Sequence, residues 1–206
     1  WFVNVSKRIN SKHQLSLTAF GAPQKHNQRK PLYAGLSIEG WNEVAKWTGE
    51  KNKYRYNAIY GFDNNGKERS SMVNEYHKPQ ISLNHQWQID YKSSLSTALY
   101  VSIGRGSGYS GQGRTSADRA MWNGSSNGQL LYNFRKTDGT FDYGAIQDMN
   151  ATSADGSRMV MSKSLNNHMW YGLLSTYTNE IATGLELSAG VDVRYYVGEH
   201  TNEIID

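Results

Sequence analysis

Alternation of apolar and polar residues is the dominant pattern along the chain. It is clearest over residues 79–91, where the odd positions are apolar except for His85 and the even positions are polar. The apolar odd positions are Pro79, Ile81, Leu83, Trp87, Ile89 and Tyr91. Further alternating segments cover residues 1–9, 15–20, 95–103, 167–179 and 185–197. A period of two predicts strands with two unlike faces, so we expect six strands and an all-β fold.

Two kinds of connection alternate between these strands. Tight turns at about residues 10–12, 92–94 and 181–183 predict hairpins at about 1–22, 79–105 and 167–199. Long loops rich in Gly, Asn, Ser and Lys, at about 23–78 and 106–166, separate the hairpins. Outer-membrane barrels combine short periplasmic turns with long extracellular loops. We therefore predict antiparallel up-and-down hairpins that form part of a transmembrane β-barrel. Its two long extracellular loops should contain little helix, with one short helix at about 141–149.

The composition limits the class of protein. The chain has 206 residues, 37% of them hydrophobic, a mean hydropathy of −0.71 and a net charge of +4. No apolar run reaches the roughly 18 residues of a membrane-spanning helix, whereas a barrel with a polar lumen tolerates low apolar content. The absence of Cys excludes thiolate chemistry and disulfides. The charge is small and scattered, so we expect no nucleic-acid partner.

Candidate chemical motifs are weak. Gly106–Gly111 matches the spacing of a dinucleotide-binding loop, but no helix pattern follows it, so we interpret it as the base of a loop. No His pair has metal-ligand spacing, and no Ser, His and Asp order indicates a hydrolase. We therefore expect no enzyme, no metal and no cofactor. Residues 41–60 interleave aromatic and basic residues, which fits either ligand binding or self-packing of a long loop.

A soluble β-sandwich, such as a carbohydrate-binding module, is the alternative fold. It explains the alternation equally well but explains the unequal loops poorly. It predicts that Ile81, Leu83 and Trp87 are buried between two sheets. Charged residues on the polar face, Asp192 and Arg194 among them, are easier to place in a wet lumen than in a packed core.

Four stretches carry a resemblance to a known family. They are Lys12–Arg29, with its FGAPQ-x-H-x-QR core; Tyr76–Trp87; Leu95–Thr97 with Tyr100–Gly106; and Asn166–Gly172 with Gly190–Tyr196. On these residues the chain resembles the β-barrel of TonB-dependent outer-membrane receptors of the Bacteroidetes type. The long loops match only loosely, as is typical of surface loops.

The resemblance implies a large antiparallel barrel with a plugged lumen in the bacterial outer membrane. Such receptors import a scarce nutrient, first of all an iron complex such as a ferric siderophore, otherwise cobalamin or a saccharide. The implied partners are the TonB complex, acting through a plug region missing here, the small nutrient ligand and outer-membrane lipid. Six strands cannot close a barrel of 22 strands, so we expect the chain to be a fragment of a larger receptor.

Five residues are the candidates for substrate contact. His26, Gln28, Arg29, Arg105 and Arg194 are expected to face the lumen or to lie at the bases of the loops. Arginine binds anionic chelates through paired hydrogen bonds. A structural salt bridge within the barrel wall is the alternative role for these arginines.

Overall fold

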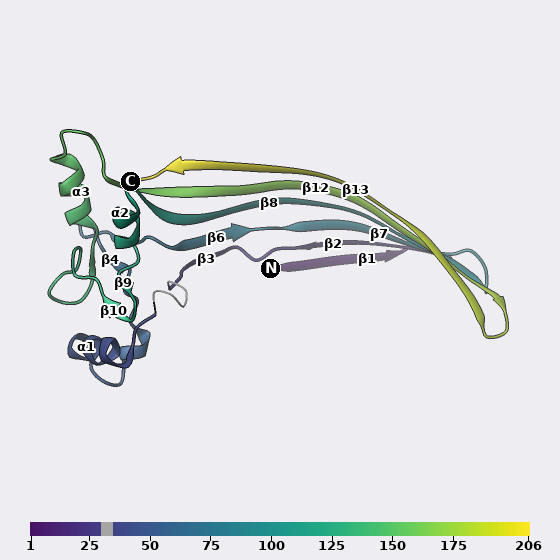
Figure 1. Cartoon of the computed structure of the whole chain (residues 1–206). Coiled ribbons are helices and arrows are strands. Elements are labelled where there is room, and N and C mark those ends of the chain that lie inside the picture. Colours follow the sequence, from purple (N-terminus) through teal and green to yellow (C-terminus); the bar gives the residue numbers. More distant parts are fainter. Residues whose placement is uncertain (30–34) are drawn as a thin grey trace. The chain divides into compact units, whose positions relative to one another are not determined.

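The computed structural model describes residues 1–29 and 35–206 and consists mostly of antiparallel β-structure, with 56% strand and 14% helix (Figure 1). The chain divides into two compact units. Unit 1 comprises Trp1–Gln24, Glu75–Ser107 and Leu165–Thr201. Unit 2 comprises Lys25–Asn74, Gly108–Ser164 and Asn202–Asp206.

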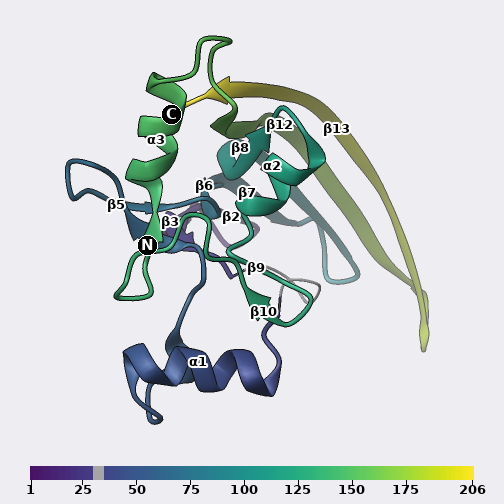
Figure 2. The same ribbon diagram turned by 60° about the vertical axis from the view of Figure 1, so that its left-hand side comes forward.

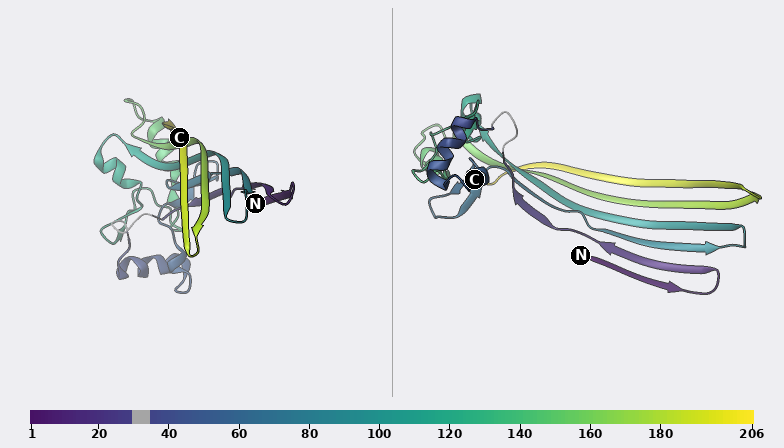
Figure 3. Two further views of the ribbon diagram at one scale, coloured as in Figure 1. Left: turned by 90° about the vertical axis from the view of Figure 1, so that its right-hand side faces the viewer. Right: turned by 90° about the horizontal axis from the view of Figure 1, so that it is seen from below.

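One up-and-down sheet contains all six predicted strands. Its order is β1-β2-β7-β8-β12-β13. The short strands β3 and β6 pair with each other, and β6 also pairs with β8. The bounds are β1 (Phe2–Arg8), β2 (His13–Phe20), β3 (Gln24–Asn27), β6 (Val73–His77), β7 (Gln80–Gln88), β8 (Ser93–Gly113), β12 (Met159–Ala182) and β13 (Leu185–Ile204). Figure 3 shows the three hairpins side by side. Within the described residues this sheet does not close on itself, because its order ends at β1 and β13.

Three strands are longer than the sequence pattern predicts. β8 continues to Gly113, β12 begins at Met159 and β13 ends at Ile204, beyond the expected limits at 105, 167 and 199. The Gly- and Ser-rich residues after Arg105 were expected to be loop, but they continue the strand. A glycine in a strand allows close approach of a neighbour: a Cβ at Gly111 would lie 2.0 Å from the ring of Trp122.

The register of the strands gives the unit 1 sheet two unlike faces. Directly paired residues share a face, and successive residues alternate between faces. On what we call the apolar face, one row is Val3, Ala19, Ile81 and Val101, and the next is Val5, Leu17, Leu83 and Leu99. On what we call the polar face, one row is Ser6, Ser16, Asn84 and Ala98, and the next is Arg8, Gln14, Gln86 and Ser96. The predicted alternation is confirmed.

The tight turns use side chains and glycine to reverse the chain. The Asn10 Oδ1 accepts hydrogen bonds from the backbone N–H groups of Lys12 and His13, each at 2.9 Å. Asp90 does the same for Lys92 and Ser93, and these bonds hold the pKa of its carboxyl below the usual range. The third turn contains Gly184 at φ +76°, a conformation that favours glycine. These Asx-type and glycine turns fix the three hairpins.

Unit 2 contains more helix than the sequence predicts. Its elements are α1 (Ile38–Thr48), a 3₁₀ turn η2 (Lys53–Arg55), β4 (Tyr60–Phe62), β5 (Glu68–Ser70), α2 (Ser116–Met121), β9 (Ser125–Ser126), β10 (Gln129–Leu130), β11 (Phe141–Asp142) and α3 (Tyr143–Ala151) (Figure 2). The helix expected at about 141–149 corresponds to α3, whereas α1 and α2 were not predicted. No helix among the described residues has the length and apolarity needed to cross a membrane.

A hydrophobic core holds unit 2 together. Its buried members are Trp122, Phe141, Tyr143, Ile146, Met159 and Met161. Asp118 at the start of α2 forms a capping box with Thr115 and an ion pair with Arg158 at 2.6 Å. The hydrogen bond from Thr115 and the charge of Arg158 lower the pKa of Asp118. The long segments that separate the predicted hairpins therefore form a unit with its own hydrophobic core.

Unit 1 has no comparable core. Among the described residues, the buried large hydrophobic side chains all belong to unit 2: Val44, Ile59, Val73, Trp122, Leu130, Phe141, Tyr143, Ile146, Met159 and Met161. On the apolar face of unit 1, Leu17 and Leu99 are each 49% exposed, and Ile81 and Leu83 are 46% and 43% exposed. The sheet of unit 1 is therefore a layer whose apolar face is left open.

Candidate functional site

A group of aromatic rings lies on the polar face of three adjacent strands. Tyr100 of β8, His168 and Trp170 of β12, and Tyr196 and Arg194 of β13 form what we call the polar-face cluster. The ring centroids of Tyr100 and Trp170 are 6.1 Å apart, those of Trp170 and Tyr196 are 6.3 Å apart, and those of His168 and Tyr196 are 6.0 Å apart. The Arg194 guanidinium carbon lies 5.7 Å from the Trp170 ring centroid. Aromatic edges and a cation over a ring are mutually favourable contacts.

Two glycines allow these rings to lie against the sheet. A Cβ at Gly172 would lie 2.1 Å from the Tyr100 Cζ, and a Cβ at Gly104 would lie 2.2 Å from the His168 Cε1. Neither contact is possible, so any larger residue would push the ring away. Rings that cover strand glycines in this way also shield the backbone at those positions.

The cluster presents hydrogen-bond donors beside its ring surfaces. Arg194 Nε donates to Asp192 Oδ1 at 2.9 Å, and its Nη2 donates to Asp192 Oδ2, so the guanidinium is held by a paired contact. The Trp170 Nε1–H is buried and has no acceptor among the described residues. A buried donor without a partner is uncommon and marks a position where an additional acceptor would be favourable. The cluster can therefore stack against a flat or apolar group.

The structure does not bring the five predicted residues into one site. Arg194 belongs to the polar-face cluster. Arg105 occupies an odd position of β8, as Val101 and Ile103 do, so it lies on the apolar face, where the predicted hairpin ends and the predicted long loop begins. Successive residues of a strand point to opposite faces, so the position of Arg105 in β8 determines its face whatever the chemistry of its side chain.

The remaining three predicted residues lie in unit 2. His26 is exposed on β3. The Gln28 backbone N–H donates to the Met72 carbonyl at 2.8 Å. Arg29 Nη2 donates to the Tyr54 carbonyl at 2.7 Å. The contacts of Gln28 and Arg29 tie segments of unit 2 together, and the Arg29 contact is a hydrogen bond to a backbone carbonyl rather than the salt bridge considered as its alternative role.

The aromatic residues of segment 41–60 pack mainly against one another and their neighbours. The ring centroids of Trp41 and Tyr54 are 5.3 Å apart, and those of Trp47 and Tyr56 are 6.1 Å apart. Burial raises the pKa of Tyr56 to about 12. These contacts favour self-packing over an open binding surface for this segment.

The sequence does not reveal most of the polar-face cluster. Tyr100, His168, Trp170 and Tyr196 occupy even positions like Arg194, and this shared parity is the available signal. Parity alone does not say which rings meet, because that depends on the register between β8, β12 and β13. The glycines at 104 and 172 are a second signal, since glycine inside a strand indicates a close approach.

Other kinds of site find no support in the described residues. Within residues 1–29 and 35–206, no three His, Asp or Glu side chains are placed to hold a metal ion. The residues Gly106–Gly111 lie inside β8 rather than before a helix, so they do not have the geometry of a dinucleotide-binding loop.

Comparison of the chain with protein-family models, with curated proteins and with solved structures finds no match.

Proposed function

We propose that the chain is a section of the β-barrel of a bacterial outer-membrane transporter of the TonB-dependent kind. The observation that carries this proposal is the open, single-layer sheet of unit 1, with exposed Leu, Ile and Val on one face and amide and hydroxyl side chains on the other. The resemblance of the hairpin sequences to that family supports the same assignment.

The apolar face suits contact with lipid acyl chains. Soluble proteins rarely expose contiguous apolar patches larger than a few hundred Å², because leaving such surface in water is costly. Here a shallow apolar hollow of about 500 Å³ runs across β2, β7, β8, β12 and β13. On β8 the apolar residues Leu99, Val101 and Ile103 lie between Thr97 and Arg105. A strand needs roughly 9–11 residues to cross the hydrocarbon core, which the strands of unit 1 approach or exceed.

The two ends of the sheet order fit a larger closed structure. β1 and β13 each have one neighbour in the sheet, and β13 is a strand of 20 residues. An unpaired edge of this length is a liability in water, and in lipid its N–H and C=O groups require partners. In the proposal, further strands pair with β1 and β13 and close the barrel.

The polar face would then line the lumen, with the polar-face cluster in the path of the nutrient. Ring surfaces and the Arg194 guanidinium, which is paired with Asp192, would border the cargo, and an iron complex is the proposed cargo because the resemblance implies it. The TonB complex would supply the energy through the plug, with no covalent catalysis. Titration of the intact receptor with a ferric siderophore, cobalamin and an oligosaccharide distinguishes the possible cargoes.

The soluble β-sandwich gains less support from the same observations. It requires a second sheet over Ile81, Leu83 and Trp87. Ile81 and Leu83 are 46% and 43% exposed, and Trp87 is half-buried. The sheet order likewise describes one layer in unit 1.

Adjacent residues of β7 provide the test of membrane insertion. Leu83 is on the apolar face and Asn84 is on the polar face. We expect Leu83→Lys to weaken partition of the chain into phosphatidylcholine vesicles by about 2–4 kcal/mol, the cost of a lysine on the lipid face near the bilayer midplane. Asn84→Lys at matched depth should have little effect. Equal effects of the two substitutions in vesicle flotation would contradict the proposal.

The sequence of the gene on either side of this segment tests the assignment to a transporter. A plug domain upstream and more hairpins downstream would support it. A secretion signal directly before Trp1 together with a stop codon after Asp206 would count against it.

A further inference from the structure

We propose that the short-turn end of the apolar face binds the anionic headgroups of phospholipids. This inference rests on the proposed function, because it assumes that the apolar face is in contact with a bilayer. The surface, which we call the headgroup belt, consists of Lys7, His13, His85 and Trp87, with Lys12 in the adjoining turn.

The position of the belt follows from the register of four paired strands. Two successive rows of the apolar face are wholly apolar, from Val3 to Val101 and from Val5 to Leu99. The next row toward the short turns is Lys7, Leu15, His85 and Thr97, and the row after it contains His13, Trp87 and Leu95. The apolar surface therefore gives way to cationic, imidazole and indole groups within two rows. Lysine and tryptophan are suited to such a boundary because each combines an apolar body with a polar tip.

The two histidines form one stacked unit with Trp87. His13 Nδ1 and His85 Nε2 are 3.0 Å apart, and the rings are parallel within 7°. The His13 ring also stacks on Trp87, with centroids 5.4 Å apart. One imidazole nitrogen of each ring is used in the shared hydrogen bond, so His13 Nε2 and His85 Nδ1 remain for other partners. An N–H at either position can donate to a phosphate oxygen.

The charges around the belt favour an anion. Lys7 and Lys12 are exposed, and Lys92 in the neighbouring turn lies 5.7 Å from the Tyr91 ring centroid. The carboxylate of the neighbouring turn, Asp90, accepts backbone hydrogen bonds from Lys92 and Ser93, and these bonds together with the charge of Lys12 lower its pKa. Glu180 and Glu186 occupy even positions of β12 and β13 and so lie on the polar face. The apolar face at this end therefore presents lysines and imidazoles without a carboxylate of its own strands.

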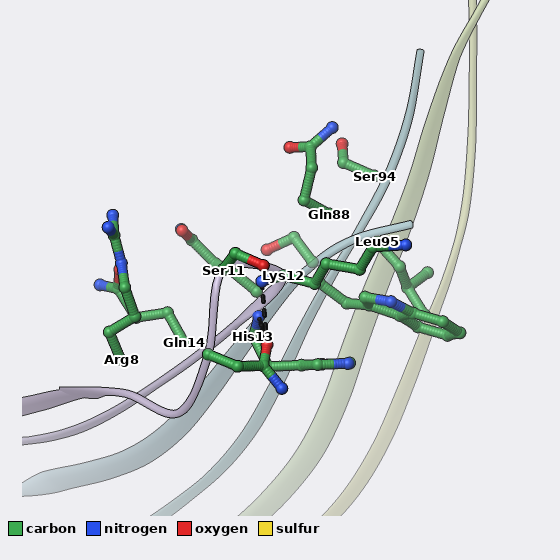
Figure 4. A pocket seen from close by; sticks show the side chains of 12 residues that line it. Arg8, Ser11, Lys12, His13, Gln14, Gln88, Ser94 and Leu95 are labelled. Carbon is green, nitrogen blue, oxygen red and sulfur yellow. Dashed lines mark hydrogen bonds between the residues drawn. The ribbon is translucent and has the colours of Figure 1, made fainter. Parts of the chain in front are cut away.

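The opposite face of the same strand supplies a matched control. Arg8 follows Lys7 in β1 but pairs with Gln14 on the polar face. Figure 4 shows Arg8 and Gln14 together with Lys12 and His13 among the residues that line a hollow of about 420 Å³ at this end of the sheet, so Arg8 borders the same hollow as part of the belt. Lys7 and Arg8 thus carry the same charge at nearly the same depth, on opposite sides of one sheet.

The test compares the binding of the whole chain to two kinds of vesicle, phosphatidylcholine alone and phosphatidylcholine with about 30% phosphatidylglycerol. We expect tighter binding to the anionic vesicles. Lys7→Gln should reduce the binding to anionic vesicles about fivefold, as expected for one lysine near an anionic surface, and leave binding to neutral vesicles unchanged. Arg8→Gln should cause a clearly smaller loss, because Arg8 lies on the polar face. Circular dichroism of both variants checks that the strands are retained.

Four results would overturn the inference. Equal losses for Lys7→Gln and Arg8→Gln would mean that only net charge matters. Binding to neutral vesicles without preference for anionic ones would reject the headgroup belt and leave the proposed function standing. Failure to bind either vesicle would contradict the proposed function itself. Abolition of the anionic preference by millimolar inorganic phosphate at constant ionic strength would indicate a site for a small anion instead of a membrane surface.

Discussion

Arg135 shows how a single side chain holds the loops of unit 2 together. Its guanidinium is largely removed from solvent, and burial lowers its pKa from the ordinary value. The acceptors of its hydrogen bonds come from separate segments: the carbonyls of Leu131, Ala58, Gly124 and Gly139, and the hydroxyl of Tyr56. None of them is a carboxylate, so the cation is held by dipoles. Removing it would leave several partly buried acceptors without a donor.

We expect Arg135→Met to lower the free energy of unfolding of unit 2 by about 3 kcal/mol, the cost of breaking a buried hydrogen-bond network. Urea titration followed by tryptophan fluorescence measures it, because Trp122 lies in the core of this unit. Arg119→Met is the control, since Arg119 is exposed in α2 and its loss should cost less than about 0.5 kcal/mol. Similar losses for both variants would contradict the role of Arg135.

Residue identities alone predict only part of the candidate site. Arg194 was expected on the polar face and lies there, in contact with Trp170 and Asp192. Arg105 was expected to face the lumen or to lie at the base of a loop, and it lies on the other face, at the predicted loop base. An arginine at the end of a strand pattern indicates where the apolar segment ends, but whether its position is odd or even determines the face of the sheet on which it lies.

Strands and helices differ in how far the sequence predicts them. The alternation in β7 and β8 is sufficient to assign each residue to a face, and the structure confirms it. α1 was missed although Ser37 caps its N-terminus and Gly49 ends it. Its Gly40 and its place inside a long polar loop obscured the helical spacing of Ile38, Trp41 and Val44. Pairing between distant strands, which builds the polar-face cluster, is not contained in any local pattern.

The contact between Gly172 of β12 and Tyr100 of β8 can be tested by substituting both residues. Gly172 of β12 leaves room for the ring of Tyr100 of β8, and a Cβ would meet that ring at 2.1 Å. We expect Gly172→Val to destabilise unit 1 and Tyr100→Ala to relieve part of that loss in the double variant. Residues in direct contact typically show coupling of about 0.5–3 kcal/mol in such a cycle. Strict additivity in thermal unfolding would show that the ring and the glycine are independent.

At the scale of the whole molecule, the two units use hydrophobic residues in opposite ways. Unit 2 buries Trp122, Phe141 and Met159 in a core of its own. Unit 1 instead exposes rows such as Val5, Leu17, Leu83 and Leu99 on one face of a sheet. Apolar side chains that stay exposed to water contribute no stability from burial, whereas the acyl chains of a bilayer would solvate the apolar face of unit 1. In unit 1 the alternating apolar residues thus share one face of the sheet, as the sequence predicts, but that face is not covered by a second layer as it would be in a soluble domain.

A cysteine scan of β7 tests directly whether the apolar face of unit 1 lies against lipid. The chain has no native Cys, so one Cys at each position from Gln80 to Gln88 carries a unique environment-sensitive fluorophore. In phosphatidylcholine vesicles, we expect labels at 81 and 83 to be shielded from water and quenched by a lipid-borne quencher, and labels at 82, 84 and 86 to remain in water and unquenched. A response without this period of two, or one that is the same with and without lipid, would contradict a membrane-facing apolar surface.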